Sequence, residues 1–303
     1  MTSASDWASL QGQLDCAAQL YGADGPHRVA AWFAQEQGRV DDPDFARLFS
    51  DHISLPGIAS LDFAHRHVTT RHGALIGGIR FYAQDIARPF VEVIAHDFED
   101  VQTLTQVTAA EWRDFAPQHL RLHVIPGTPL PAKGTLDMSL YVGRYRDLRA
   151  PAHRVQLGVF DSAKQALCIV EDRFEVMAQH DPDLRRNVSP ISHEALSEMF
   201  EVGQVHRITA VGQGTVGLIA AMPGHIGWVA GDEIIEAVVA IGHAGHGYAA
   251  AAQFALSARN EDKGEAMLIG TIDGLNIASR RSAERVGRKR IIDYVFLPLD
   301  PPA

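Results

Sequence analysis

The residues best suited to bind a ligand lie in the stretch Val239–Ala249, which reads VAIGHAGHGYA. An apolar run before it predicts a strand, and an alanine-rich segment after it predicts a helix. Gly242, Gly245 and Gly247 allow the backbone to turn and to approach a ligand closely. Because the first N–H groups of a helix lack helical partners and lie at its positive end, this loop suits a phosphate or pyrophosphate. A tight turn without a ligand would give the same pattern.

Two common phosphate-binding motifs fit this loop poorly. A dinucleotide fold needs Gly-x-Gly-x-x-Gly after an early strand and several further strand–helix units. Here the glycine spacing is Gly-x-x-Gly-x-Gly, and the loop lies close to the end of the sequence. A P-loop needs Gly-Lys-Ser/Thr, and no lysine is near.

A second informative stretch is Asn276–Gly287, NIASRRSAERVG. Asn276 can cap the start of a helix, and Gly287 can end it in a left-handed conformation. On its own, this pattern indicates a well-capped helix and no particular chemistry.

Together, the two stretches resemble the GNAT-type N-acetyltransferase superfamily. The family's coenzyme-A loop reads Arg/Gln-Gly-x-Gly-x-Gly/Ala, and Gly245–Ala249 fits it. The family's later helix reads Asn-x-x-Ser followed by Ala-Glu-Arg/Lys-hydrophobic-Gly. The matching residues are Asn276, Ser279, Ala283, Glu284, Arg285, Val286 and Gly287. The resemblance covers Val155–Leu297, about half of the chain, and both motifs occur in the family's order.

The resemblance implies acetyl-CoA as co-substrate and no metal. The residues that it implies for coenzyme binding are Val239, Ile241, Ala244, Gly245, His246, Gly247, Tyr248, Ala249, Asn276, Ser279 and Arg281. Three positions depart from the family pattern. Ala244 replaces the Arg/Gln that opens the loop, and Arg288 replaces an aromatic residue after the helix-ending glycine. Ala283 stands where many members carry a tyrosine that acts as general acid.

Acyl transfer to an amine requires a base, because a primary amine with a pKa near ~10 is mostly protonated at neutral pH. Glu233 and Glu236 lie in the strand before the loop, three residues apart, which predicts that they point to opposite faces. We expect Glu236, deeper in the apolar run, to be the base, although both carboxylates could instead be solvated at a strand edge. The resemblance implies an oxyanion-binding backbone N–H near Val239. Ser279, Ser282 or water could protonate the leaving thiolate.

The surrounding elements predict an α/β protein with a mixed sheet and two domains, residues 1–149 and 150–303. The second is expected to be the GNAT-like, acyl-CoA-binding catalytic domain. The first half repeats part of its order, with a hairpin at 59–83, a strand at 90–95, a helix at 100–115 and a strand at 120–125. It could be a degenerate GNAT-like copy that shapes the substrate cleft. The acidic loop after Ala95, His-Asp-Phe-Glu-Asp, would repel pyrophosphate.

Composition narrows the class of protein. The 303 residues carry a net charge of -10, which argues against a nucleic-acid partner. The chain has two scattered cysteines and no secretory pattern, and it lacks an apolar run of about 20 residues. We therefore expect a cytoplasmic protein without membrane segments. His65 and His67 alternate on a predicted strand without acidic or cysteine neighbours, so we expect no metal there.

The function expected from these observations is transfer of an acetyl or related acyl group from coenzyme A to an amine. The acceptor could be a small molecule or a protein, and the sequence leaves open whether the protein forms a homo-oligomer. One alternative is a non-catalytic acyl-CoA sensor or regulatory protein. Another is a relative that transfers aminoacyl groups from transfer RNA, which the basic run Arg280–Arg290 fits but the net charge does not.

Overall fold

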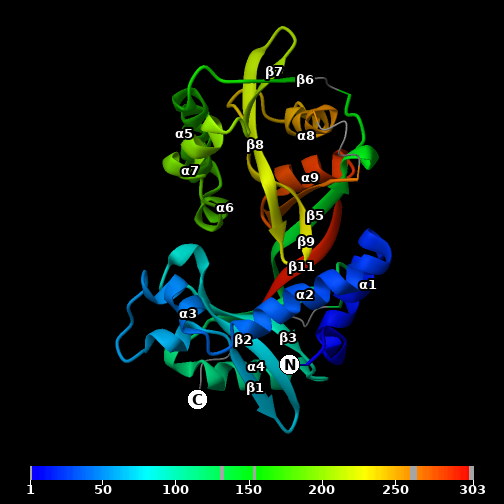
Figure 1. The fold of residues 1–303 in the computed structure, drawn as a ribbon. Coiled ribbons are helices and arrows are strands. Elements are labelled where there is room, and N and C mark those ends of the chain that lie inside the picture. The colour runs from blue at the N-terminus through cyan, green and yellow to red at the C-terminus, as the bar shows by residue number, and fades with distance from the viewer. Residues whose placement is uncertain (1, 130–132, 153–154, 260–264, 300–303) are drawn as a thin grey trace. The chain divides into compact units, whose positions relative to one another are not determined.

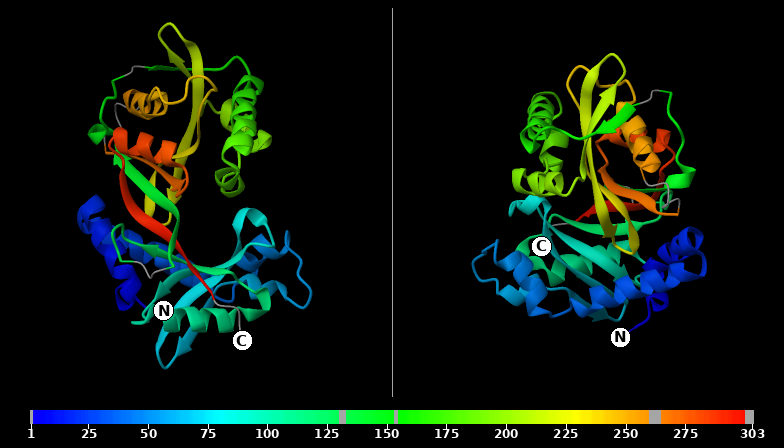
Figure 2. Two further views of the ribbon diagram at one scale, coloured as in Figure 1. Left: turned by 180° about the vertical axis from the view of Figure 1, so that it is seen from behind. Right: turned by 45° about the horizontal axis from the view of Figure 1, so that its top comes forward.

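The chain forms two compact units whose boundaries do not follow the halves of the sequence. The structure is a computed structural model that describes residues 2–129, 133–152, 155–259 and 265–299. One unit is Met1–Met138 with Ile291–Ala303, and the other is Ser139–Arg290. Figure 1 and Figure 2 show the fold as a ribbon coloured along the chain. The division therefore differs from the boundary expected between residues 149 and 150.

The difference arises because each half of the sequence gives a strand to the other unit. Strand β5 (Thr135–Arg144) runs from the first unit into the second, where it lies next to β10. Strand β11 (Lys289–Pro298) comes after all of the second unit and pairs antiparallel with β4 of the first.

The first unit has a mixed sheet in the order β1-β2-β3-β4-β11. Strands β1, β2 and β3 are antiparallel neighbours, whereas β3 and β4 are parallel. Its elements are α1 (Gln11–Tyr21), α2 (Gly25–Gly38), α3 (Pro43–Ser50), β1 (Arg66–Thr70), β2 (Gly73–Phe81), β3 (Pro89–His96), α4 (Val101–Glu111) and β4 (His119–Val124).

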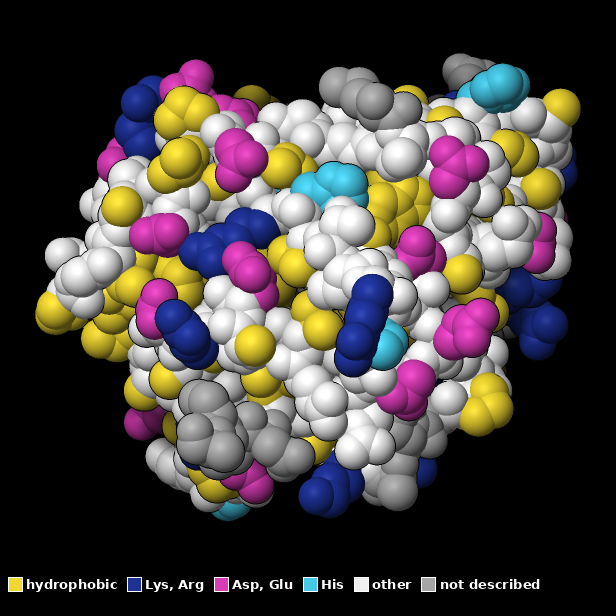
Figure 3. All heavy atoms as spheres, turned by 90° about the horizontal axis from the view of Figure 1, so that it is seen from below, with side chains coloured by type: hydrophobic (Ala, Val, Ile, Leu, Met, Phe, Trp, Pro, Cys, Tyr) yellow, Lys and Arg dark blue, Asp and Glu magenta, His cyan; other side chains and the backbone are white. Residues whose placement is uncertain are grey.

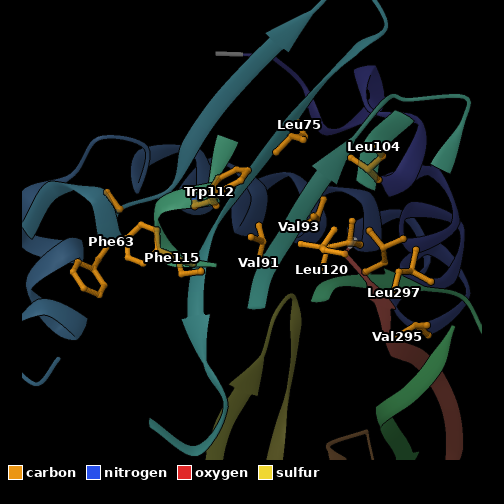
Figure 4. Packing of buried hydrophobic residues seen from close by; sticks show 14 of the residues in the cluster. Phe63, Leu75, Val91, Val93, Leu104, Trp112, Phe115, Leu120, Val295 and Leu297 are labelled. Carbon is orange, nitrogen blue, oxygen red and sulfur yellow. The ribbon is translucent and has the colours of Figure 1, made fainter. Parts of the chain in front are cut away.

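One hydrophobic cluster of the first unit lies between a face of its sheet and α4. Alternate residues of each strand point into it because side chains in a strand alternate between faces. Figure 4 shows Val91 and Val93 of β3 beside Leu120 of β4 and Trp112 at the end of α4 (Figure 4). Val295 and Leu297 of β11 complete this cluster, so the core of the first unit needs residues from the far end of the sequence.

The second unit also has a mixed sheet, in the order β5-β10-β9-β8-β7-β6. Strands β6 to β9 are antiparallel neighbours, and β9 and β10 are parallel. The elements not yet given are β6 (Val155–Gly158), α5 (Ala163–His180), α6 (Pro182–Asn187), α7 (His193–Glu201), β7 (Val205–Ala210), β8 (Gly214–Ile226), β9 (Val229–Val239), α8 (Tyr248–Ala258), β10 (Met267–Asp273) and α9 (Ile277–Arg285).

Helices cover both faces of the second sheet. Helices α5, α6 and α7 lie on one side of the β8–β9 ribbon, and α8 and α9 lie on the other (Figure 2). The neighbouring residues Leu218 and Ile219 of β8 follow this division. Leu218 packs in the cluster with α5 and α7, and Ile219 packs in the cluster with α8.

Strand β9 contains a β-bulge at Ile235. Glu236 pairs with Ala220 of β8 and Ile234 pairs with Ala221, so Ile235 is an extra residue without an opposite partner. A bulge of this kind changes which residues share a face of the strand. The pairing of β9 with β10 ends close by, at Glu233 and Ile269.

The first unit repeats this irregularity. In β3, Ala95 pairs with Ile76 of β2 and Val93 pairs with Gly77, which leaves Ile94 as the extra residue. The pairing of β3 with β4 ends at Glu92 and Arg121. The two units therefore share the order hairpin, bulged strand, helix and parallel strand, and Ala95 occupies the position that Glu236 holds in the second unit.

The α/β fold class with a mixed sheet, predicted from the sequence, is confirmed. Strands β8 and β9 pair with each other as a long antiparallel hairpin that turns between Ile226 and Val229. In the part of the chain that the structure describes, no helix combines the length and the apolar character needed to cross a bilayer.

The exchange of strands predicts how fragments behave. Residues 1–149 alone lack β11, and residues 150–303 alone lack β5, so each fragment has an incomplete sheet. We expect neither fragment to unfold cooperatively by circular dichroism. Co-expressed, the two should form a 1:1 complex that co-purifies and unfolds cooperatively. A stable, monomeric 150–303 fragment would contradict the exchange.

Candidate functional site

A cleft of about 490 Å³ lies in the second unit where β9 and β10 separate. The two parallel strands pair only at Asp232–Leu268 and Glu233–Ile269, and then diverge toward their carboxyl ends. The separated ends and the elements around them form the walls. The lining includes residues of α5, β9, the loop before α8, β10 and α9. All of these elements belong to one compact unit.

The bulge at Ile235 places Glu233 and Glu236 on the same face of β9. Directly opposite residues of antiparallel strands share a face. Glu236 is opposite Ala220 and Glu233 is opposite Met222, two residues apart on β8. The prediction that the two carboxylates point to opposite faces is therefore wrong, because it assumed unbroken alternation. Both lie on the side of α5 to α7, but only Glu236 lines the cleft.

The Glu236 carboxylate is held by two backbone N–H groups. Ile191, in the segment between α6 and α7, donates to Oε2 at 3.2 Å, and Ala237 donates to Oε1 at 3.2 Å. Burial raises the pKa of Glu236, and these two hydrogen bonds oppose the rise. Burial also raises the pKa of Glu233, with His225 opposing. A carboxylate with a raised pKa is a better proton acceptor than an exposed one.

Next along β9, the N–H of Val239 points away from β8. Ala240 donates to the Val216 carbonyl at 2.8 Å, and bonded and non-bonded pairs alternate along an antiparallel ladder. The pair Val239–Gly217 is thus non-bonded. Because β10 has already diverged, this N–H is directed toward the cleft.

The glycine-rich loop leads from β9 into α8 with three left-handed residues. Gly242, Gly245 and Gly247 have φ angles of 87°, 82° and 79°, a region that other residues rarely adopt. Gly247 is the N-cap of α8, and no side chain caps the helix. The N–H groups of the first turn therefore face the loop with the positive end of the helix dipole. His246 folds back on this loop, with Nδ1 3.1 Å from the Ala244 carbonyl oxygen.

In the first unit, the N-terminus of the corresponding helix, α4, is capped by a side chain. Asp100 is the N-cap of α4, and its carboxylate accepts hydrogen bonds from Gln102 N at 3.2 Å and Thr103 N at 2.8 Å. The position that an anion could occupy is thus already filled by a carboxylate.

Helix α9 forms the opposite wall. Asn276 caps it by accepting a hydrogen bond from Ser279 N at 3.0 Å, as predicted. Ser282 donates to the Ala278 carbonyl at 3.0 Å. The guanidinium groups of Arg281 and Arg285 bring positive charge to this wall.

The basic run after Asn276 does not form one patch. Arg281 and Arg285 line the cleft, whereas Arg280 donates to Tyr141 Oη and the Gly274 carbonyl. Arg288 is buried.

On the face shown in Figure 3, Lys and Arg side chains lie among Asp and Glu side chains and do not gather into one basic patch.

Most of the residues predicted to bind or react meet at this cleft. Those that line it are Glu236, Val239, Ala244, Gly245, Gly247, Tyr248, Ala249, Asn276, Ser279, Arg281 and Ser282. Glu233, Ile241 and His246 do not line it, and Ile241 is 53% exposed. Lining residues that the sequence did not indicate are Arg173, Phe174, Met177, Val188, Ser189, Gln253, Gly270, Thr271, Ile272 and Asp273.

The two histidines at the start of the β1 segment, His65 just before the strand and His67 within it, have structural contacts. His65 is buried, with Nε2 3.1 Å from Glu36 Oε2 and Nδ1 3.3 Å from an Arg80 nitrogen. The ring of His67 packs at 5.8 Å from that of Trp7. Within the described residues, no group of three His, Cys, Asp or Glu side chains is arranged to hold a metal ion.

Solved structures similar to this chain include several GNAT proteins. One is an acetyltransferase of the GNAT family from Colwellia psychrerythraea, with 9% identity, a TM-score of 0.47, and coverage of 85% of this chain and 95% of that one. Another is a GCN5-related N-acetyltransferase from Sphaerobacter thermophilus, with 11% identity, a TM-score of 0.47, and coverage of 100% and 95%. A tandem GNAT protein from the clavulanic acid biosynthesis pathway has 15% identity, a TM-score of 0.40, and coverage of 100% and 98%.

No protein-family model matches the chain, and no curated protein matches it.

The raised pKa of Glu236 predicts a specific dependence of stability on pH. In the unfolded chain a glutamate titrates near ~4.3. Since the native pKa is higher, the native state binds more protons between the two values, and the free energy of unfolding falls as pH rises through that interval. Glu236→Gln removes this titration, so the variant should gain stability relative to wild type as pH rises above about 4 through this interval.

Urea unfolding at a series of pH values measures this difference. The control is Glu175→Gln, which removes an exposed carboxylate on α5. A constant difference between Glu236→Gln and wild type across the series would show that the carboxyl has an ordinary pKa.

Proposed function

We propose that the second unit binds an acyl-coenzyme A in the cleft between β9 and β10 and transfers its acyl group to an amine. One observation carries the proposal. The two strands diverge beside a half-buried glutamate, and the open end of the gap leads through the glycine loop to an uncapped helix N-terminus. A long ligand with an anionic end and a reactive end fits such a gap.

The loop and α8 would bind the pyrophosphate. Backbone N–H groups at a helix start suit phosphate oxygens, and glycines allow the close approach. Arg281 and Arg285 on α9 add attraction for an anion. The missing Arg/Gln at Ala244 costs little here, because backbone groups provide most of the contacts.

The chemistry follows from the groups at the other end of the cleft. The amine nitrogen attacks the thioester carbon and forms a C–N bond, while Glu236 accepts the amine proton directly or through a water molecule. The negative charge that develops on the carbonyl oxygen is met by the Val239 N–H. The C–S bond then breaks, and the thiolate takes a proton from water or from Ser279, which water then reprotonates, while Glu236 returns the amine proton to solvent. Ser282 suits this role less well, since its hydroxyl already donates to the Ala278 carbonyl.

The first unit is proposed not to bind coenzyme. Ala95 stands at the position of Glu236, so the copy lacks the base. The N–H of His96, which corresponds to that of Ala237, donates to Ser9 Oγ at 2.8 Å. Residues near the N-terminus thus occupy the equivalent gap, and Asp100 fills the anion position at α4.

Binding of acetyl-CoA is the first test. At a free concentration of about 100 times Kd, acetyl-CoA should add about 2.7 kcal/mol to the free energy of unfolding, seen as a raised Tm. NAD and ATP at the same concentration should have much smaller effects. Gly245→Val should abolish the gain, because a branched side chain would fill the space that the pyrophosphate approaches.

Gly212→Val is the matched control for this substitution. Gly212 has a φ of +73°, similar to +82° at Gly245, and both have open space around the added Cβ. Gly212 lies in the β7–β8 turn, outside the cleft. The two variants should lose similar stability, but only Gly245→Val should lose acetyl-CoA binding. Retained binding in a folded Gly245→Val variant would make the loop purely structural.

The second test separates an enzyme from a sensor. Glu236→Gln should leave coenzyme affinity about unchanged and lower kcat/KM for an amine acceptor by ~10²–10⁴. Glu233→Gln, outside the cleft, should have a much smaller effect. If acetyl-CoA binds but no amine in a broad panel is acylated, the sensor function is favoured over catalysis.

A further inference from the structure

Arg288 is a buried cation at the closed end of the cleft. It follows Gly287 after α9, is 4% exposed, and contributes to the cleft lining. Two glycines leave room for it. A Cβ at Gly270 would lie 3.1 Å from its Nη2, and a Cβ at Gly143 would lie 3.1 Å from its Cγ.

The hydrogen-bond partners of this guanidinium are all neutral. Nη1 donates to Gln253 Oε1 at 3.2 Å, and Nη2 donates to the carbonyls of Tyr141 at 2.8 Å and Gly270 at 3.3 Å. Nε is buried without a partner. Among the described residues, the hydrogen bonds of Arg288 include none to an Asp or Glu, and burial lowers its pKa to about 9. A cation buried without a counter-ion is unfavourable, and a bound anion would relieve the cost.

The location of Arg288 indicates which part of a ligand it meets. Gly270 follows Ile269, the last residue of β10 that pairs with β9, so Arg288 lies at the point where the strands begin to diverge. In the proposed function, the pyrophosphate lies at the open end, and the acyl end must lie near Glu236. Arg288 is thus placed for the far end of the acyl group.

Arg288 and Glu236 lie on opposite faces of the sheet, so the end of the acyl group and the acceptor approach from different sides. Arg288 contacts Gln253 of α8, so it lies on the face that α8 covers. Glu236 lies on the face of α5 to α7, where it would deprotonate the amine. A carboxylate on the acceptor would therefore enter from the other side.

We propose that Arg288 binds a carboxylate at the end of the acyl group, so that the donor is the coenzyme A thioester of a dicarboxylic acid. The inference rests on the proposed function and specifies its substrate class. Arginine suits this role because its buried Nε–H has no partner and can donate a charge-assisted hydrogen bond to a carboxylate oxygen, and because its charge persists at neutral pH. On this proposal, the arginine that stands in place of the family's aromatic residue determines which acyl group is accepted.

The test compares succinyl-CoA with butyryl-CoA, which differ by a carboxylate in place of a terminal methyl group. By calorimetry, wild type should bind succinyl-CoA at least about tenfold more tightly, as a charged hydrogen bond implies. Arg288→Gln should bind the two about equally while it retains affinity for free coenzyme A. Arg288→Lys, which keeps the charge, should retain part of the preference. Arg259→Gln, which removes a cation outside the cleft, should keep all of it.

Each outcome bears on a different claim. Equal binding of succinyl-CoA and butyryl-CoA by wild type overturns the assignment even if the variants fail to fold, and it leaves the proposed function intact. A preference that persists in folded Arg288→Gln also overturns it. If wild type binds none of these thioesters or coenzyme A, the proposed function itself fails. A discrimination seen only between amino acids and the corresponding amines as acceptors would assign the carboxylate to the acceptor and contradict the proposal.

Discussion

The early end of the pairing between β9 and β10 is the constraint on which the candidate site depends. Two parallel strands that paired along their full length would leave no space between them, and their backbone groups would be occupied by each other. Because pairing stops after Glu233 and Ile269, the remaining part of β9 presents backbone N–H groups to an open cleft. The bulge at Ile235 adds to this effect, since it turns the Glu236 carboxylate to the edge of the gap. The geometry of the sheet thus creates both the space and the reactive groups.

Both units have a bulged strand that parts early from its parallel neighbour, and they differ in the residues at the bulge and at the start of the next helix. At the bulge, the second unit has Glu236 where the first has Ala95. At the helix start, the second unit has Gly247 where the first has Asp100, whose carboxylate caps α4. A common backbone therefore forms an open cleft in one unit and a closed structure in the other, according to a few side chains.

Sequence reasoning succeeded where a property is local. The glycine spacing predicted the turn into α8, and Asn276 predicted the start of α9, because both depend on residues within one or two turns. It failed for the faces of Glu233 and Glu236, since a bulge depends on the pairing with β8 and leaves no mark in the sequence of β9. It also missed Arg173, Phe174 and Met177, which reach the cleft from α5, far away along the chain. The exchange of β5 and β11 was likewise hidden, because each strand looks ordinary alone.

The return of β11 to the first unit also sets an order of events during synthesis. The core of the first unit includes Val295 and Leu297, and its strand β4 has an unpaired edge until β11 arrives. On the ribosome, the first unit therefore waits in an incomplete state while the whole second unit is made. A domain made early can usually fold first, but here the first unit becomes complete only after β11 has been made. An exposed sheet edge invites pairing with other chains, so the waiting chain is vulnerable to aggregation. A premature stop near the C-terminus would damage the unit that was made first.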